Sequence, residues 1–132
     1  MAEVSPILGL EHLHVYCSDL ETSERWFREN LGAELVARRQ LNGVAASELQ
    51  LGGIRLVLGG NRPEDGLVAP RPRPFGWDHI GLKVQDLDAC AAALKRRGVV
   101  FEREPHQARP GLRIAFVTGP DDLRIELLER RD

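Results

Sequence analysis

Two stretches of this chain carry the same pattern and decide its fold. One reads Glu11-His12-Leu13-His14-Val15-Tyr16-Cys17-Ser18-Asp19-Leu20-Glu21, and the other reads Asp78-His79-Ile80-Gly81-Leu82-Lys83-Val84-Gln85-Asp86-Leu87-Asp88. In each stretch an acidic residue precedes a histidine, alternating apolar residues follow, and Asp-Leu-acidic closes the pattern. An internal repeat of this kind predicts two copies of one structural unit. His12 and His79 are therefore expected at equivalent positions, each early in the first strand of its copy.

The same order of elements is expected in both copies. Asp19 and Asp86 are suitable N-caps, because a short carboxylate accepts hydrogen bonds from the exposed amides of a first helical turn. Gly32 and Gly98 lie where a left-handed residue would end each helix. Three strand-like runs follow each helix, at about 33–41, 44–51 and 54–59 and then at about 99–106, 112–118 and 123–129. Each copy is thus predicted to be a βαβββ module, which gives an α+β fold.

The division of the chain follows from the repeat. A single domain is expected over 1–132, with module one at about 7–60 and module two at about 77–130. The linker between them, 61–76, contains repeated prolines, which fix the backbone and remove hydrogen-bond donors. These prolines are Pro63, Pro70, Pro72 and Pro74.

Composition excludes several classes of function. A net charge of -2 offers no broad positive field for nucleic acid or an anionic membrane. No apolar run approaches the roughly 20 residues that a membrane span requires. The first residues lack the pattern of a secretory signal, and Cys17 and Cys90 have no paired spacing, so a cytoplasmic protein with reduced cysteines is expected. A small molecule is the expected partner.

Three residues could form a metal site. His12 and His79 open their modules, and Glu126 lies in the last predicted strand of module two. Alternation places Glu126 on the face opposite Ile125 and Leu127. Two imidazoles and a carboxylate suit a divalent ion of Fe, Mn, Ni, Co or Zn and leave coordination positions open. Spacing alone also fits two polar strand residues and an edge carboxylate.

The repeated histidine pattern, ending in Pro120-Asp121-Asp122-Leu123-Arg124-Ile125-Glu126-Leu127, resembles the vicinal oxygen chelate superfamily. That superfamily includes glyoxalase I, extradiol dioxygenases, fosfomycin-resistance enzymes and bleomycin-binding proteins. The resemblance covers about 8–129. It implies paired βαβββ modules that form an open, barrel-like sheet around a metal cavity, in a protein that is often a homodimer. It also implies that His12, His79 and Glu126 are the metal ligands.

Two positions depart from the patterns of known members. Glyoxalase-like members usually carry a fourth ligand, which also serves as the base, in the last strand of module one. Here that position is Val57, which cannot bind a metal. Ring-cleaving and fosfomycin enzymes typically carry a tyrosine ten residues before the final glutamate, and here that position is Phe116. Both residues are expected to line the substrate cavity.

Other side chains are candidates for catalysis or substrate binding. His14 should share a strand face with His12 and could act as a general base near neutral pH, or it could be a partly exposed histidine bonded to a carboxylate. Tyr16 continues that face and could contact the substrate or simply pack. Glu48 is a second candidate carboxylate whose face is left open. Arg124 could bind an anionic substrate or pair with a nearby acid.

The resemblance implies a divalent-metal-dependent enzyme that acts on a small, oxygen-chelating substrate. Its metal would stabilise an enolate-like or oxygen-bound intermediate as a Lewis acid. Lyase, isomerase and dioxygenase outcomes all remain open. The alternative is a non-catalytic drug-binding protein of the bleomycin-resistance type, which would sequester its ligand in the cleft.

Overall fold

The computed structural model describes residues 6, 8–41, 43–61, 66–67 and 75–131. Module one contains β1 (Leu13–Tyr16), α1 (Leu20–Leu31), β2 (Glu34–Leu41), β3 (Val44–Leu51) and β4 (Ile54–Gly59). Module two contains β5 (Ile80–Lys83), α2 (Leu87–Arg96), β6 (Val100–Arg109), β7 (Leu112–Thr118) and β8 (Arg124–Arg130). The predicted βαβββ order is confirmed in both.

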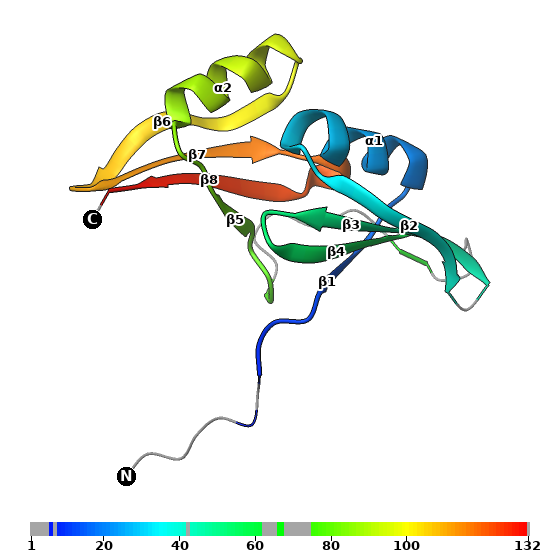
Figure 1. Cartoon of the computed structure of the whole chain (residues 1–132). Helices are drawn as coiled ribbons and strands as arrows, with labels where there is room; N and C mark the ends of the chain where they lie inside the picture. Colours follow the sequence, from blue (N-terminus) through cyan, green and yellow to red (C-terminus); the bar gives the residue numbers. More distant parts are fainter. Residues whose placement is uncertain (1–5, 7, 42, 62–65, 68–74, 132) are drawn as a thin grey trace.

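Each module forms its own open, four-stranded sheet (Figure 1). The strand orders are β1-β4-β3-β2 and β5-β8-β7-β6, so the two sheets share one topology. The first strand pairs in parallel with the last, and the other pairings are antiparallel. Each helix packs on one face of its own sheet. The α+β fold is therefore confirmed, and the opposite face of each sheet is left for the candidate site.

The predicted helix starts and the left-handed glycine at the end of α1 are confirmed, whereas the C-cap of α2 is Arg97 and the left-handed Gly98 follows it. The Asp19 carboxylate accepts a hydrogen bond from the Thr22 amide at 3.1 Å, and Asp86 accepts one from the Ala89 amide at the same distance. Gly32 ends α1 in the left-handed region, with φ of 70°. These caps fix where each helix starts, just after the first strand of its module.

Some expected boundaries were wrong or lie outside the described residues. His12 and His79 were expected early within their first strands, but β1 begins at Leu13 and β5 at Ile80, so each histidine immediately precedes its strand. The second-module strands also run beyond their predicted ends, to Arg109 and Arg130. The linker prolines and Asn42 lie outside the described part of the chain.

One hydrophobic core includes residues of both modules. Phe27 of α1 and Leu94 of α2 are almost fully buried within it. The alternation predicted for the last strand is confirmed, because Ile125 and Leu127 are buried in this core whereas Glu126 lies on the other face and is only partly buried. In the described part of the chain, no helix has the length and apolar character needed to cross a membrane.

The modules differ in how each helix is fastened to its sheet. In module one the buried Glu24 of α1 accepts hydrogen bonds from Arg38 Nη2 at 2.7 Å and from Ser47 Oγ at 2.6 Å. Hydrogen bonds from Arg38, then from Ser47, lower the pKa of Glu24 to about 2 although burial opposes the shift. The equivalent residue of α2 is Ala91, which is buried and has no polar side-chain atom. The sequence pattern did not reveal this polar anchor.

A direct contact ties the two modules together. The Ser18 amide, between β1 and α1, donates to the Asp121 carboxylate at 3.0 Å. Asp121 lies in the turn that precedes β8 and has a positive φ of 55°, which is uncommon for a residue other than glycine. Helix α1 also packs on the short turn Pro120–Asp122. The turn thus joins the start of α1 to module two.

Candidate metal centre

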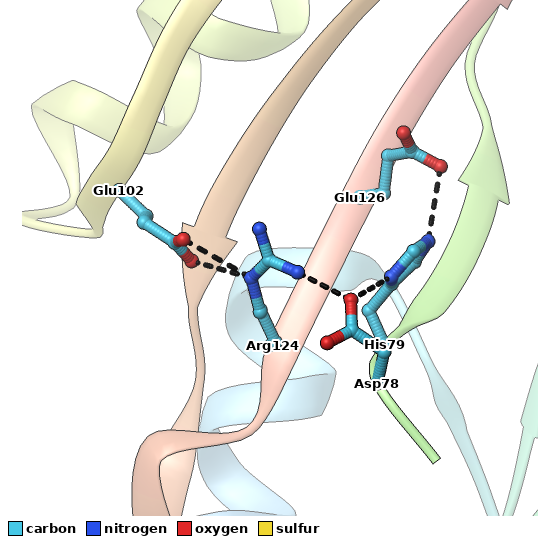
Figure 2. A network of polar contacts seen from close by, with 5 residues as sticks. All are labelled: Asp78, His79, Glu102, Arg124 and Glu126. Atoms are coloured by element: carbon cyan, nitrogen blue, oxygen red, sulfur yellow. Dashed lines mark hydrogen bonds and ion pairs between the residues drawn. The ribbon is translucent and has the colours of Figure 1, made fainter. Parts of the chain in front are cut away.

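The strongest candidate site lies at the paired ends of β5 and β8. Gly81 of β5 lies opposite Glu126 of β8, and His79 precedes Gly81 by two residues, so the imidazole and the carboxylate meet. His79 Nε2 and Glu126 Oε1 are 3.3 Å apart (Figure 2). The His79 side chain is 31% exposed and that of Glu126 is 15% exposed. The structure therefore brings together two of the three predicted ligands.

His79 is held on its other side by Asp78. His79 Nδ1 lies 2.7 Å from Asp78 Oδ2, and Arg124 Nη1 contacts the same oxygen. Arg124 is itself held by Glu102 of β6 through its Nε, at 2.9 and 3.1 Å from the two carboxylate oxygens. Figure 2 shows the resulting row from Glu102 through Arg124, Asp78 and His79 to Glu126. The pairing alternative for Arg124 is thus the one observed.

Electrostatics keep Asp78 and Arg124 ionised. The hydrogen bond with His79, followed by the charge of Arg124, holds the pKa of Asp78 below its ordinary value. Hydrogen bonding to Glu102, and the nearby charge of Asp78, raise the pKa of Arg124. Asp78 therefore remains an acceptor for His79 across the neutral pH range.

Phe116 packs between two members of the row. Its ring meets the His79 ring edge to face, with centroids 5.2 Å apart and planes at 88°. The Arg124 guanidinium lies over the same ring, 4.3 Å from its centroid. A tyrosine would add a hydroxyl at this position, but the buried phenylalanine offers only apolar surface. Its visible role is to support the imidazole and the guanidinium.

Module one repeats part of this arrangement around His12. His12 Nδ1 lies 2.9 Å from Glu11 Oε1, and Arg55 Nη1 donates to the same oxygen at 3.0 Å. Arg55 also pairs with Glu48 of β3, which Arg39 contacts at 3.0 Å. The hydrogen bond with His12 and the charge of Arg55 lower the pKa of Glu11. Arg55 was not among the predicted site residues, although alignment of the two last strands pairs it with Arg124.

The position of Glu48, which the sequence left open, is now defined. Glu48 lies directly opposite Val57 in the β3–β4 pairing, so both share the face that points away from α1. The carboxylate is bound by Arg39 and Arg55, and hydrogen bonds from Arg55 and then Arg39 lower its pKa. Glu48 therefore acts as an ion-pair partner of two guanidinium groups. Val57 itself is 9% exposed.

His14 and Tyr16 share one face of β1, as alternation predicted, and that face is exposed. Their rings stack at 5.0 Å with an interplanar angle of 43°. The His14 ring occupies the space above Gly59 of β4, where any Cβ atom would overlap His14 Nε2. In module two the large and the small residue change strands: Gly81 of β5 stands at the position of His14, and Leu128 of β8 stands at the position of Gly59.

The third predicted ligand does not join the other two within one chain. Among the described residues, no group of three or more His, Cys, Asp or Glu side chains is arranged to hold a metal ion. The donor chemistry of His79 and Glu126 nevertheless fits a divalent cation, because an imidazole nitrogen and a carboxylate oxygen face each other at 3.3 Å. These two residues supply two donors, one fewer than the predicted set of three ligands.

Comparison with known proteins places this geometry in context. Residues 9–127 match the family model described as the Glyoxalase/Bleomycin resistance protein/Dioxygenase superfamily. The chain is 29% identical over 126 residues to the uncharacterized protein YwkD of Bacillus subtilis. That alignment covers 92% of this chain and 97% of YwkD. It is 27% identical to the probable chloroplastic lactoylglutathione lyase of Arabidopsis thaliana, over 90% of this chain but 35% of that longer protein.

A solved structure shares the fold. The genomically encoded fosfomycin resistance protein FosX from Listeria monocytogenes, crystallised with Mn(II) and sulfate, superposes with a TM-score of 0.72. The alignment covers 93% of both chains at 17% identity. At this level of identity the likeness establishes the arrangement of the two modules.

Proposed function

Because the chain belongs to the Glyoxalase/Bleomycin resistance protein/Dioxygenase superfamily, we propose that it is a divalent-metal-dependent enzyme acting on a small substrate with two neighbouring oxygen atoms. The observation that carries the proposal is the pair formed by His79 Nε2 and Glu126 Oε1 at 3.3 Å. A neutral imidazole and a carboxylate at this distance present two lone pairs to one point, which a cation would stabilise. The Mn(II) in the FosX structure supports the same class of ion.

His12 is proposed as the third ligand, supplied by a second copy of the chain. Within one chain His12 belongs to no three-residue ligand group among the described residues. The segments before both histidines expose large apolar side chains, with Leu8 103% exposed, Leu10 71% and Trp77 90%. Residues 8–10 extend away from the sheets in Figure 1. A homodimer would cover this apolar surface and bring His12 of one copy to His79 and Glu126 of the other.

The remaining residues suggest how the chain would handle its substrate. When bound, a divalent ion supplies Lewis-acid chemistry toward two substrate oxygens. His14, exposed and free of steric conflict above Gly59, is proposed as the group that takes up and returns a proton. Tyr16 stacks against His14 and, with Val57, Phe116 and Arg124, is proposed to shape the substrate cavity. Lyase chemistry is favoured by the Arabidopsis relative.

Metal analysis tests the proposal directly. Protein purified without chelator, or reconstituted with Fe, Mn, Ni, Co and Zn in turn, should hold about one divalent ion per chain. The double variant His79→Ala, Glu126→Ala should lose that ion, whereas a variant of the distant His106 should keep it. Retention of metal by the double variant would refute the site. Wild-type protein that binds none of these ions would instead favour a drug-binding protein.

A mixed dimer tests whether the site is shared. His12→Ala and His79→Ala each remove one ligand from both sites of their own homodimers. In a heterodimer of the two variants, one shared site regains both histidines and the other loses both. Metal binding should therefore return to about one ion per heterodimer. If both ligands came from the same chain, the heterodimer would bind no metal, and the shared site would be excluded.

A further inference from the structure

Both modules surround their first histidine with the same pair of charged residues. In module two Asp78 accepts from His79 Nδ1, and Arg124 of the last strand contacts that carboxylate (Figure 2). In module one Glu11 and Arg55 take these roles around His12. Each acid directly precedes its histidine. Each arginine follows an isoleucine or a leucine at the start of the last strand of its module.

We propose that Asp78 with Arg124, and Glu11 with Arg55, are positioning pairs that hold His79 and His12 in the Nδ1–H tautomer. A neutral imidazole carries one N–H, and an ionised carboxylate can only accept. His79 Nδ1 lies 2.7 Å from Asp78, whereas its Nε2 lies 3.3 Å from the second carboxylate, Glu126. The shorter contact favours the proton on Nδ1, which leaves the lone pair on Nε2 for a ligand. This inference rests on the proposed function and assigns residues beyond the metal ligands themselves. Such partners set the orientation of ligating histidines.

The arginines keep each carboxylate in place. Arg124 Nε is bound by Glu102 of β6, and Arg55 Nε pairs with Glu48 of β3. Each guanidinium is thus anchored at Nε, and its Nη1 reaches the acid beside the histidine. A planar guanidinium held at two edges has little rotational freedom. The carboxylate therefore has one preferred orientation, and the imidazole takes its orientation from it.

The repetition separates this arrangement from chance surface pairing. The carboxylate that binds the arginine Nε comes from strands that are not equivalent, β6 in module two and β3 in module one. Only module two has a glutamate at the position of Glu126. An acid and an arginine nevertheless recur around the first histidine of each module. An exposed ion pair elsewhere in module two, Arg113 with Asp88 at 2.8 Å, has no histidine between its members. In both modules the pairing of an acid with an arginine thus coincides with the presence of the first histidine.

Nitrogen NMR of the histidine rings tests the tautomer in metal-free protein, at a pH where the imidazoles are neutral. Wild-type His12 and His79 should both show the Nδ1–H pattern. Asp78→Ala should shift His79 toward the Nε2–H form, and Asp78→Glu, which introduces the acid of module one, should restore Nδ1–H. Asp88→Ala is the matched control and should change neither ring. An Nε2–H tautomer in the wild type, or no change in Asp78→Ala, would overturn the proposal.

Metal affinity gives the second readout. Titration with Mn(II) or Zn(II) should show affinity reduced about 10–100-fold in Asp78→Ala, the range for lost partners of ligating histidines. Arg124→Met should give a smaller loss, and thermal unfolding should show that both variants remain folded. If the wild type binds no metal but has the Nδ1–H tautomers, the proposed function fails and the positioning pairs stand. If metal binds but Asp78→Ala binds it equally well, the positioning role fails alone.

Discussion

Module one and module two are built on one plan but differ at the positions that face the candidate site. Both have an acid, a histidine and an arginine in the same relation. Module two adds Glu126, whereas module one has Val57 at the equivalent place. Module one adds His14, where module two has Gly81. The repeat thus preserves the charged partners of the histidines, while the proposed ligand Glu126 and the proposed proton-transfer group His14 each belong to one module.

The largest expected effect comes from removing the ligand that only module two possesses. Glu126→Val gives module two the residue found in module one. We expect metal affinity to fall at least about 100-fold, because an anionic ligand is lost from a site that has few ligands. Isothermal titration with Mn(II) measures this.

The matched control is truncation at the equivalent position of module one. Val57→Ala removes only apolar surface and should leave the metal affinity within about twofold of wild type. Equal losses of affinity in Glu126→Val and Val57→Ala would mean that the two modules contribute alike, contrary to the division described here.

The second effect concerns the helices. Glu24→Gln should lower the free energy of unfolding by about 2 kcal/mol, since a charged acceptor in contact with Arg38 and Ser47 becomes a neutral amide. Because the folded-state pKa of about 2 lies below the ordinary value of 4.5, this stability is fully present above pH 4.5 and is lost as pH falls toward 2. Urea denaturation at pH 7 and at pH 3 should therefore show a smaller difference between wild type and variant at pH 3.

Glu29, an exposed glutamate of the same helix, supplies the control for that measurement. Glu29→Gln should change the stability by less than about 0.5 kcal/mol at either pH. If Glu29→Gln had the same effect as Glu24→Gln, the charge of the helix as a whole would explain the result. The contacts of Glu24 with Arg38 and Ser47 would then not be what distinguishes α1 from α2.

The smallest expected effect is a coupling energy of about 1 kcal/mol between the residues of exchanged size on the first and last strands. Gly59→Leu should destabilise the protein by about 1–3 kcal/mol, because the side chain would occupy the space of the His14 ring. His14→Gly alone opens that space. The double variant reproduces the Gly81 and Leu128 arrangement of module two and should recover about 1 kcal/mol relative to the sum of the single changes.

Chemical denaturation of the four proteins in this cycle gives the coupling energy. Activity should not return in the double variant, because His14 is the proposed proton-transfer group. Strictly additive changes in stability would show that His14 and Gly59 are independent, and the size exchange would then be incidental.

Much of the framework could be predicted from local pattern. The helix starts at Asp19 and Asp86 follow from capping chemistry, and the inward alternation of Ile125 and Leu127 follows from the two-residue period of a strand. The prediction that His12 and His79 lie within their first strands was wrong, because alternation continues through both histidines even though the strand pairing does not. Ladder partners, and not side-chain type, decide where a strand begins.

The candidate site was less accessible from the sequence. The repeat pointed to His12, His79 and Glu126, but only the β5–β8 register showed that His79 and Glu126 meet. Arg55 gave no local signal, since an arginine in a strand usually reads as a solvated residue. The role of Glu24 was hidden for a similar reason, because a glutamate in a helix is ordinarily exposed. Contacts between distant segments gave both residues their partners.

The sequence by itself determined the repeat, the two βαβββ modules and the equivalence of His12 and His79, because these depend on periodicity and on residues that cap or break elements. Only the tertiary structure decided which charges meet: Asp78 with Arg124, Glu24 with Arg38, and Ser18 with Asp121. Among the described residues of one chain, it also left His12 outside any three-residue ligand group, a question that the sequence had left open. The physical reason is that period and capping act over a few residues, whereas ion pairs and metal sites join side chains whose separation only packing fixes.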